Sequence, residues 1–305
     1  MICSLLLENV VMSGLLNKLQ LRPARDVATC FTSCLSARHN IAFTHLQNCR
    51  HRYLTRGASY SSSERWLKRQ LKDPYVQAAR KEGLPSRAKY KLEQIDQKYS
   101  IFHETQVVLE LGAAPGSWSV YIVEKIGKEG LLVTVDLLDL DRRTKSKIQL
   151  NYPTSFIPIE GDFRTDQIKQ KVVQHLNLSV NAQRNDSYAS AYLVDVILSD
   201  MAPNFTGDQR TDALRTMALC EDALLFAIGS AFDMSTIYHE NDNAGLLKLG
   251  GTFLCKYFTC GNENEKNFLD ALKYNFRKVD IVKPPSSRRE SSEKYVIATH
   301  FVGKR

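Results

Sequence analysis

Short apolar runs alternate with longer amphipathic segments from residue 107 to residue 301. The apolar runs predict strands, and the segments with a helical repeat predict helices. The predicted strands are 107–111, 130–135, 156–160, 193–198, 250–257, 278–282 and 295–301. The predicted helices are 118–125, 166–176, 211–233 and 263–274. This alternation indicates an α/β, Rossmann-like fold with a mostly parallel seven-stranded sheet and helices on both faces.

Polar stretches and a basic segment surround this pattern. Residues 177–191 and 235–245 lack apolar periodicity, and we expect them to be exposed loops. Residues 64–82 predict a basic helical segment that breaks at Asp73 and Pro74. In the run 86–92 that follows, Tyr90 and Leu92 can face a core while Lys89 and Lys91 face outward.

The first 60 residues have a different composition from the rest of the chain. They are rich in Arg, Ser, Thr and Leu, and residues 1–63 contain seven basic and two acidic side chains. This composition is typical of a mitochondrial presequence. We therefore expect residues 1–60 to be a targeting segment, disordered or removed, and residues 61–305 to form one domain in the mitochondrial matrix. The alternatives are a disordered tail, or a translated upstream region that precedes a start at Met12.

Composition limits the classes of protein that remain. The net charge of +8 is concentrated in the first segment, so the rest of the chain is only mildly basic, and any nucleic-acid affinity there must come from local patches. No stretch approaches the roughly 20 apolar residues of a membrane helix, and we expect no membrane span. The seven cysteines form no CxxC pair, which favours free thiols and argues against disulfides and a metal site.

A turn of small residues, 112–117, joins the first predicted strand to its helix. Glycine allows a ligand to approach the backbone closely at such a turn. The turn lacks the Lys and Ser/Thr of a phosphate loop and the third glycine of the dinucleotide fingerprint, which argues against an NTP and a dinucleotide. A nucleoside with a charged but unphosphorylated tail fits better, and S-adenosylmethionine is such a ligand.

Three carboxylates follow three predicted strands. Asp136, Asp162 and Asp200 should meet near the turn, because ligands bind beyond the carboxyl ends of strands in a doubly wound sheet. Asp136 is placed to accept hydrogen bonds from ribose hydroxyls, and Asp162 from an adenine amino group. A single acid at a strand end is often only a helix cap, but three beside a small-residue turn indicate a nucleoside site.

Basic side chains interleaved with Trp66 and Tyr75 precede this site, and others follow the sixth predicted strand. Charge combined with aromatic rings suits contact with RNA, although a solvated helix face is the simpler alternative. The candidate RNA-binding residues are Arg65, Lys68, Arg69, Arg87, Lys89, Lys283, Arg288 and Arg289.

From about Ser62 onward, the chain resembles the FtsJ/RrmJ-type ribosomal RNA 2′-O-ribose methyltransferases, and most closely a mitochondrial member. Seven motifs in the family's order carry this resemblance. They are the stretches 86–92, 111–118, 135–138, 161–163, 198–204 and 250–256, and the positions from Lys283 through Arg288 to Glu293 and Tyr295. Ser117 departs from the pattern, since it replaces the usual second glycine after the proline.

The resemblance implies a catalytic set of Lys91, Asp200, Lys256 and Glu293, with Lys256 accepting the proton of the ribose hydroxyl. It also implies S-adenosylmethionine as the cofactor. The candidate cofactor-binding residues are Gly112, Pro115, Gly116, Ser117, Trp118, Asp136, Asp162, Phe163 and Asp200. The implied activity is 2′-O-methylation of a uridine in mitochondrial large-subunit rRNA by a monomeric enzyme that acts on the precursor of that subunit and supports ribosome assembly.

Two questions stay open at this level. A lysine accepts a proton only when it is neutral, and Lys91 and a sulfonium would favour neutral Lys256 whereas Asp200 and Glu293 would oppose it. A charged Lys256 could instead orient the hydroxyl, with positioning supplying most of the acceleration. The rival functions are a tRNA or cap ribose methyltransferase of the same fold, and an rRNA-binding assembly factor that is mainly non-catalytic.

Overall fold

The structure is a computed structural model that describes residues 70–183, 194–229, 245–259, 261 and 263–303. These residues belong to one compact unit, Arg65–Arg305. The predicted targeting segment 1–60, and the basic positions Arg65, Lys68 and Arg69, lie outside the described residues.

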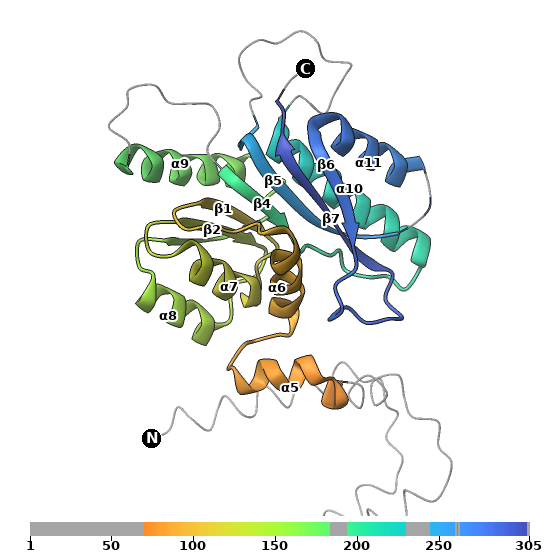
Figure 1. Ribbon diagram of the computed structural model, residues 1–305, viewed down its shortest axis with the longest axis horizontal. Helices are drawn as coiled ribbons and strands as arrows, with labels where there is room; N and C mark the ends of the chain where they lie inside the picture. Colours follow the sequence, from red (N-terminus) through yellow and green to blue (C-terminus); the bar gives the residue numbers. More distant parts are fainter. Residues whose placement is uncertain (1–69, 184–193, 230–244, 260, 262, 304–305) are drawn as a thin grey trace, which may run out of the picture. The chain divides into compact units, whose positions relative to one another are not determined.

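A seven-stranded sheet forms the centre of this unit and confirms the predicted fold class (Figure 1). The strands lie in the order β3-β2-β1-β4-β5-β7-β6. All neighbouring pairs are parallel except those that β7 makes with β5 and β6. The strands are β1 (Val107–Leu111), β2 (Leu131–Asp136), β3 (Phe156–Glu160), β4 (Val194–Ser199), β5 (Leu247–Phe258), β6 (Phe276–Val282) and β7 (Glu293–Phe301).

Helices cover both faces of the sheet (Figure 1). One face packs against α6 (Ala88–Tyr99), α7 (Ser117–Ile126) and α8 (Arg142–Asn151). The other packs against α9 (Asp166–Gln183), α10 (Gln209–Ile228) and α11 (Glu263–Asn275). Because β1 is buried on both faces, its residues are almost all apolar.

The helix α5 (Pro74–Lys81) precedes this layered body. It begins where the sequence predicts a break, because the Asp73 carboxylate accepts a hydrogen bond from Tyr75 N at 3.0 Å and Pro74 occupies the first turn. The α5 helix packs on α6 through the rings of Tyr75 and Tyr90, whose centroids are 5.5 Å apart.

Three segments differ from the sequence prediction. The run 86–92 leads into α6, where Leu92 is buried as expected but Lys91 turns inward rather than outward. The α8 helix was not predicted, because only Thr144 and Ile148 of its ten residues are buried and the apolar repeat is too weak. The α9 helix extends to Gln183, into the stretch predicted as a loop; residues 184–191 and 235–244 lie outside the described part.

Two further findings concern the limits set by composition. No helix in the described ranges is long and apolar enough to span a membrane. Cys220 and Cys255 are buried free thiols.

The strand order reverses between β1 and β4, and this switch point at the carboxyl ends of the strands is where a doubly wound sheet binds its ligand.

Candidate functional site

A cavity of about 360 Å³ lies at the carboxyl ends of β1, β2, β3 and β4. This is within the usual range for a small-molecule site. Its lining includes five of the predicted cofactor-binding residues, together with apolar and basic side chains from the loops after these strands and from β2, β5 and α10. The lining residues are Gly112, Ala114, Val135, Asp136, Leu137, Leu138, Gly161, Asp162, Phe163, Arg164, Asp200, Met201, Ala202, Leu219 and Lys256.

Gly112 allows two loops to meet at the floor of this cavity. Its φ is +80°, and a Cβ placed there would come within 2.8 Å of the backbone nitrogen of Met201. A side chain would therefore be strained by its conformation and would collide with the loop that follows Asp200. Asp200 N in turn donates to Leu111 O at 3.0 Å, which fixes that loop to the end of β1.

Asp136 points its carboxylate at the small-residue turn. One oxygen accepts from Ala114 N at 2.8 Å and the other from Leu138 N at 2.9 Å. A carboxylate oxygen can accept two hydrogen bonds, so each keeps capacity for a ligand hydroxyl. The exposed side chains of Leu137 and Leu138 lie beside it in the lining and offer an apolar surface.

Asp162 is held differently. Arg164 forms a two-pronged ion pair with it, with Nε to Oδ1 at 3.0 Å and Nη2 to Oδ2 at 2.7 Å. This hydrogen bonding lowers the pKa of Asp162 despite partial burial, so the group stays ionised at neutral pH. The next residue, Phe163, is buried and connects the lining to the core.

The other predicted cofactor-binding residues, Pro115, Gly116, Ser117 and Trp118, do not line the cavity. Ser117 Oγ instead accepts from Ser86 N at 2.9 Å, and Trp118 Nε1 donates to Ala88 O at 2.8 Å. Both side chains are buried. In this structure they join the small-residue turn to the start of α6.

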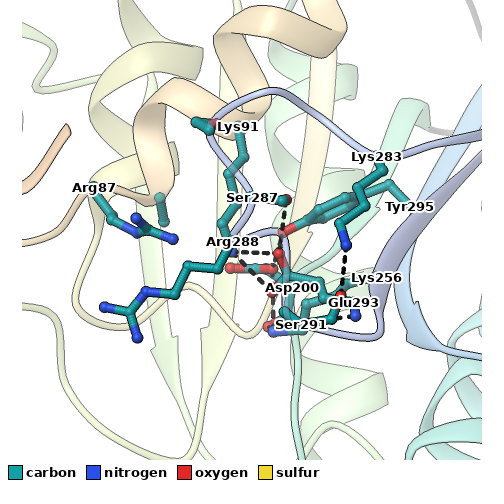
Figure 2. Close-up of polar contacts among 12 residues, drawn as sticks. Arg87, Lys91, Asp200, Lys256, Lys283, Ser287, Arg288, Ser291, Glu293 and Tyr295 are labelled. Carbon is teal, nitrogen blue, oxygen red and sulfur yellow. Dashed lines mark hydrogen bonds and ion pairs between the residues drawn. The ribbon is translucent and has the colours of Figure 1, made fainter. Parts of the chain in front are cut away.

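The four predicted catalytic residues come together as two ion pairs, which we call the charged cluster: Lys91, Asp200, Lys256 and Glu293 (Figure 2). Lys91 Nζ lies 2.7 and 2.8 Å from the two carboxylate oxygens of Glu293. Lys256 Nζ lies 3.2 Å from Asp200 Oδ1 and also donates to Asp200 O. All four side chains are less than one-fifth exposed.

Tyr295 joins the two ion pairs, and we did not predict a role for it. Its hydroxyl donates to Asp200 Oδ1 at 3.1 Å, and Lys91 Nζ lies 5.9 Å from its ring centroid. Burial and the nearby carboxylates raise the pKa of Tyr295, so its hydroxyl keeps its proton at neutral pH. Tyr295 lies two positions after Glu293, and this spacing on a strand places both on one face, which is the signal that could have identified it.

Ser287 is a second unpredicted contact, since its hydroxyl donates to Glu293 Oε1 at 3.0 Å. Burial alone would raise the pKa of Glu293, but the charge and hydrogen bonds of Lys91, with smaller contributions from Lys256 and Ser287, outweigh it. The net effect lowers the pKa of Glu293, which therefore remains a carboxylate.

Glu110 is a third residue that the sequence reasoning passed over. It is the fourth of the five residues of β1, is 1% exposed, and accepts a hydrogen bond from Ser119 Oγ at 2.7 Å. Burial raises its pKa from 4.5 to about 8. An acid inside a strand that is otherwise apolar was the available signal.

The predicted RNA-binding residues that the structure describes are partly engaged with the protein itself. Arg87 forms an ion pair with Asp73, and Arg288 Nε lies 3.9 Å from the same carboxylate. Lys89 pairs with Glu82 at 2.9 Å. Lys283 Nζ donates to Arg289 O at 3.0 Å, while the Arg289 side chain is exposed. Figure 2 shows Arg87, Lys283 and Arg288 around the charged cluster.

These residues fit S-adenosylmethionine. Asp136 retains acceptor capacity for ribose hydroxyls, Leu137 and Leu138 provide an apolar wall, and the cavity size is adequate. Gly112, Asp136 and Asp162 would hold the nucleoside portion. Within the described residues, no group of three or more His, Cys, Asp or Glu side chains could hold a metal ion.

Comparisons with known proteins agree with the geometry. Two curated relatives are called ribosomal RNA large subunit methyltransferase E. The one from Brucella ovis is 38% identical over 81% of this chain and 87% of its own length, and the one from Gluconobacter oxydans is 38% identical over 79% and 74%. A solved structure of a Plasmodium falciparum protein, titled as a ribosomal RNA methyltransferase, shares the fold, with a TM-score of 0.50 and 23% identity over 72% of this chain and 98% of its own.

The family model that matches the chain is described as FtsJ-like methyltransferase and covers residues 84–301. This span begins just before α6 and ends with β7, so it includes the cavity and the charged cluster. It also confirms the resemblance to the FtsJ/RrmJ-type family stated from the seven motifs. The chain therefore belongs to the FtsJ-like methyltransferase family and is an enzyme whose methyl donor is S-adenosylmethionine.

Proposed function

We propose that this enzyme methylates a ribose 2′-hydroxyl of ribosomal RNA, with a uridine of the mitochondrial large-subunit RNA as its target. The observation that carries the chemistry is that Lys256 and Asp200 belong both to the cavity lining and to the charged cluster. A methyl donor bound in the cavity would therefore lie beside the side chains that we propose to handle the proton. The names of the curated relatives support ribosomal RNA as the substrate.

The charged cluster supplies what a ribose hydroxyl needs. When bound, S-adenosylmethionine supplies an activated methyl group. A hydroxyl is a poor nucleophile unless its proton is accepted as the new bond forms. We assign this role to the Nζ atom of Lys256, which Asp200 holds through its backbone carbonyl and its carboxylate.

The remaining residues position this amine. Tyr295 donates to the Asp200 carboxylate and fixes its orientation. Glu293 neutralises Lys91, whose Nζ lies 5.9 Å from the centroid of the Tyr295 ring. Ser287 donates to Glu293 Oε1, an oxygen that Lys91 also contacts. We assign Lys91 and Glu293 to orienting the ribose, because an ion pair held this firmly provides donors and acceptors in fixed positions.

The mitochondrial part of the proposal is supported by the basic, acid-poor composition of residues 1–60. We propose that this segment directs the chain to the matrix, where it acts as a monomer on the precursor of the large ribosomal subunit. Its test is the location of the fluorescently tagged full chain compared with tagged residues 61–305. Import of the shorter chain to the same extent would contradict the targeting role.

The substrate is tested by incubating the purified enzyme with labelled S-adenosylmethionine and, separately, mitochondrial large-subunit rRNA (free and within the precursor subunit), tRNA and capped mRNA. A 2′-O-methyl group protects the adjacent phosphodiester from alkali, so partial alkaline hydrolysis locates the modified nucleotide. We expect one protected uridine in the rRNA. Preferred labelling of tRNA or of the cap would indicate a rival substrate, and no labelling of any RNA would indicate a non-catalytic assembly factor.

A further inference from the structure

Phe205 is an exposed aromatic side chain beside the charged cluster. It lies on the loop between β4 and α10, five positions after Asp200, and is 56% exposed. Among the described residues with large, exposed hydrophobic side chains, the aromatic ones are Phe205 and Tyr274. Tyr274 lies on α11, whereas Phe205 lies on the same loop as Asp200, which belongs to the charged cluster. Phe205 does not line the cofactor cavity, so the cofactor does not account for it.

A second ring supports Phe205. The centroids of Phe205 and Phe258 are 5.4 Å apart and their planes meet at 83°, which is an edge-to-face contact. Phe258 lies two positions after Lys256 on β5 and directly opposite Glu293 on β7. Alternate residues of a strand face the same side, as do opposite residues of an antiparallel pair. The two rings therefore border the charged cluster.

The backbone that follows Phe205 is fixed in place. The Asp212 carboxylate accepts from Thr206 N at 2.7 Å, from Thr206 Oγ1 at 2.8 Å and from Gly207 N at 3.0 Å. These hydrogen bonds lower the pKa of Asp212, which therefore remains ionised at neutral pH. One residue further, Asp208 caps α10 by accepting from Thr211 N at 2.7 Å. The anchored turn limits the movement of the Phe205 ring and leaves it open to solvent.

On the basis of the proposed function, we propose that Phe205, supported by Phe258, stacks on an unpaired base of the RNA substrate next to the target ribose. Proteins that bind single-stranded RNA use exposed aromatic rings in this way, because every base has a π-face. Stacking needs no particular base, so this contact selects for an unpaired strand rather than for a sequence. It complements the basic side chains, which contact phosphates in paired and unpaired RNA alike.

The binding test compares wild type with Phe205→Ala, Phe205→Trp and the control Tyr274→Ala. The probes are a fluorescent 12-nucleotide oligouridylate and a fully paired 12-base-pair RNA duplex, measured by anisotropy. We expect Phe205→Ala to weaken oligouridylate binding about tenfold, as expected for the loss of one stacked base, and to leave duplex affinity unchanged. Phe205→Trp and Tyr274→Ala should bind both probes as wild type does. Unchanged S-adenosylmethionine affinity and melting temperature confirm that Phe205→Ala is folded.

The Phe205→Trp variant also reports contact directly. Its additional tryptophan emission should be quenched by oligouridylate and not by the duplex, because a stacked base quenches indole fluorescence. Oligouridylate binding by Phe205→Ala within twofold of wild type, or unchanged Phe205→Trp emission, would overturn the stacking proposal. Neither readout requires turnover. If wild type methylates no RNA, the proposed function fails while these two measurements still decide whether Phe205 contacts a base.

Discussion

The two parts of the site are built from the chain in different ways. The cofactor cavity depends on short contiguous stretches of sequence. In one, β1 leads directly into the small-residue turn at Gly112, and in another, β2 ends at Asp136. The charged cluster joins residues that are far apart, since Lys91 and Glu293 are 202 positions apart in the chain. The cavity therefore follows from local sequence, whereas the cluster depends on the topology of the whole sheet.

The reversed strand β7 explains how the charged cluster forms. Parallel strands present their carboxyl ends at the edge of the sheet where the cavity lies. An antiparallel strand presents its amino end at that edge, and Glu293 is the first residue of β7. The pairing of Tyr295 with Lys256 in the ladder then brings Tyr295 and Glu293 to the face that holds Lys256. Substitutions in the two parts should consequently have separable effects on transfer and on cofactor affinity.

The largest expected effect is that of Lys256→Ala on methyl transfer. If Lys256 accepts the proton, its loss should lower the transfer rate by about 10²- to 10⁴-fold. S-adenosylmethionine affinity should change little, because Gly112, Asp136 and Asp162, which we expect to hold the nucleoside, line other parts of the cavity. Single-turnover transfer of labelled methyl groups and calorimetric titration with S-adenosylmethionine measure the two quantities. Near-normal turnover would remove the assignment of Lys256.

Lys256→Arg separates the two roles that the sequence leaves open for this residue. Arginine stays charged and can orient a hydroxyl, but it cannot accept a proton. We expect Lys256→Arg to be as inactive as Lys256→Ala in the same single-turnover assay. Substantial activity of the arginine variant, with an inactive alanine variant, would favour orientation by a charged residue.

Asp136→Ala should have the next largest effect, on the other part of the site. It removes a charged acceptor of ribose hydroxyls, and a hydrogen bond to a charged group is worth about 1.5–3 kcal/mol, or roughly 10- to 150-fold in Kd. Oligouridylate affinity should stay at the wild-type level. Asp139→Ala is the matched control, because Asp139 is exposed and absent from the lining. Equal S-adenosylmethionine affinities of the two variants would exclude a binding role for Asp136.

The contrast between the two parts also explains what the sequence could predict. The strands of the cofactor side lie within one residue of the predicted ones, and Asp136 and Asp162 line the cavity at the strand ends, because a buried strand followed by an acid is a local pattern. No local pattern shows that Lys91 turns inward, since that depends on packing of α6 against the loop before β7. The family resemblance supplied the members of the charged cluster, and only the structure shows Tyr295 between them.

The buried acid of β1 gives a prediction about stability, because the pKa of Glu110 is about 8 in the folded chain and 4.5 when unperturbed. Between these values the folded chain holds a proton that the unfolded chain has released. The contribution of Glu110 to the free energy of unfolding therefore falls by about 1.4 kcal/mol per pH unit as pH rises from 4.5 to 8, and levels off above 8.

Glu110→Gln removes this titration while keeping a partner for Ser119. Relative to wild type, its free energy of unfolding should rise as pH increases from 5 to 8. Urea denaturation at several pH values measures this difference, and the exposed residue Glu104 provides the control Glu104→Gln. A constant difference between wild type and Glu110→Gln across this range would show that Glu110 does not take up a proton on folding.

The smallest expected effect concerns RNA held outside the cofactor cavity. Reversing Arg288 and Arg289 to Glu should weaken rRNA binding about three- to tenfold at low salt, less at high salt, and leave S-adenosylmethionine affinity unchanged, because phosphate contacts are electrostatic. The double variant Lys273→Glu/Arg277→Glu makes the same change in net charge at exposed positions on α11 and β6. If both double variants lose the same affinity, overall charge explains the loss. A selective loss in the Arg288/Arg289 variant places the RNA backbone beside Glu293, on the side of the site that the charged cluster forms.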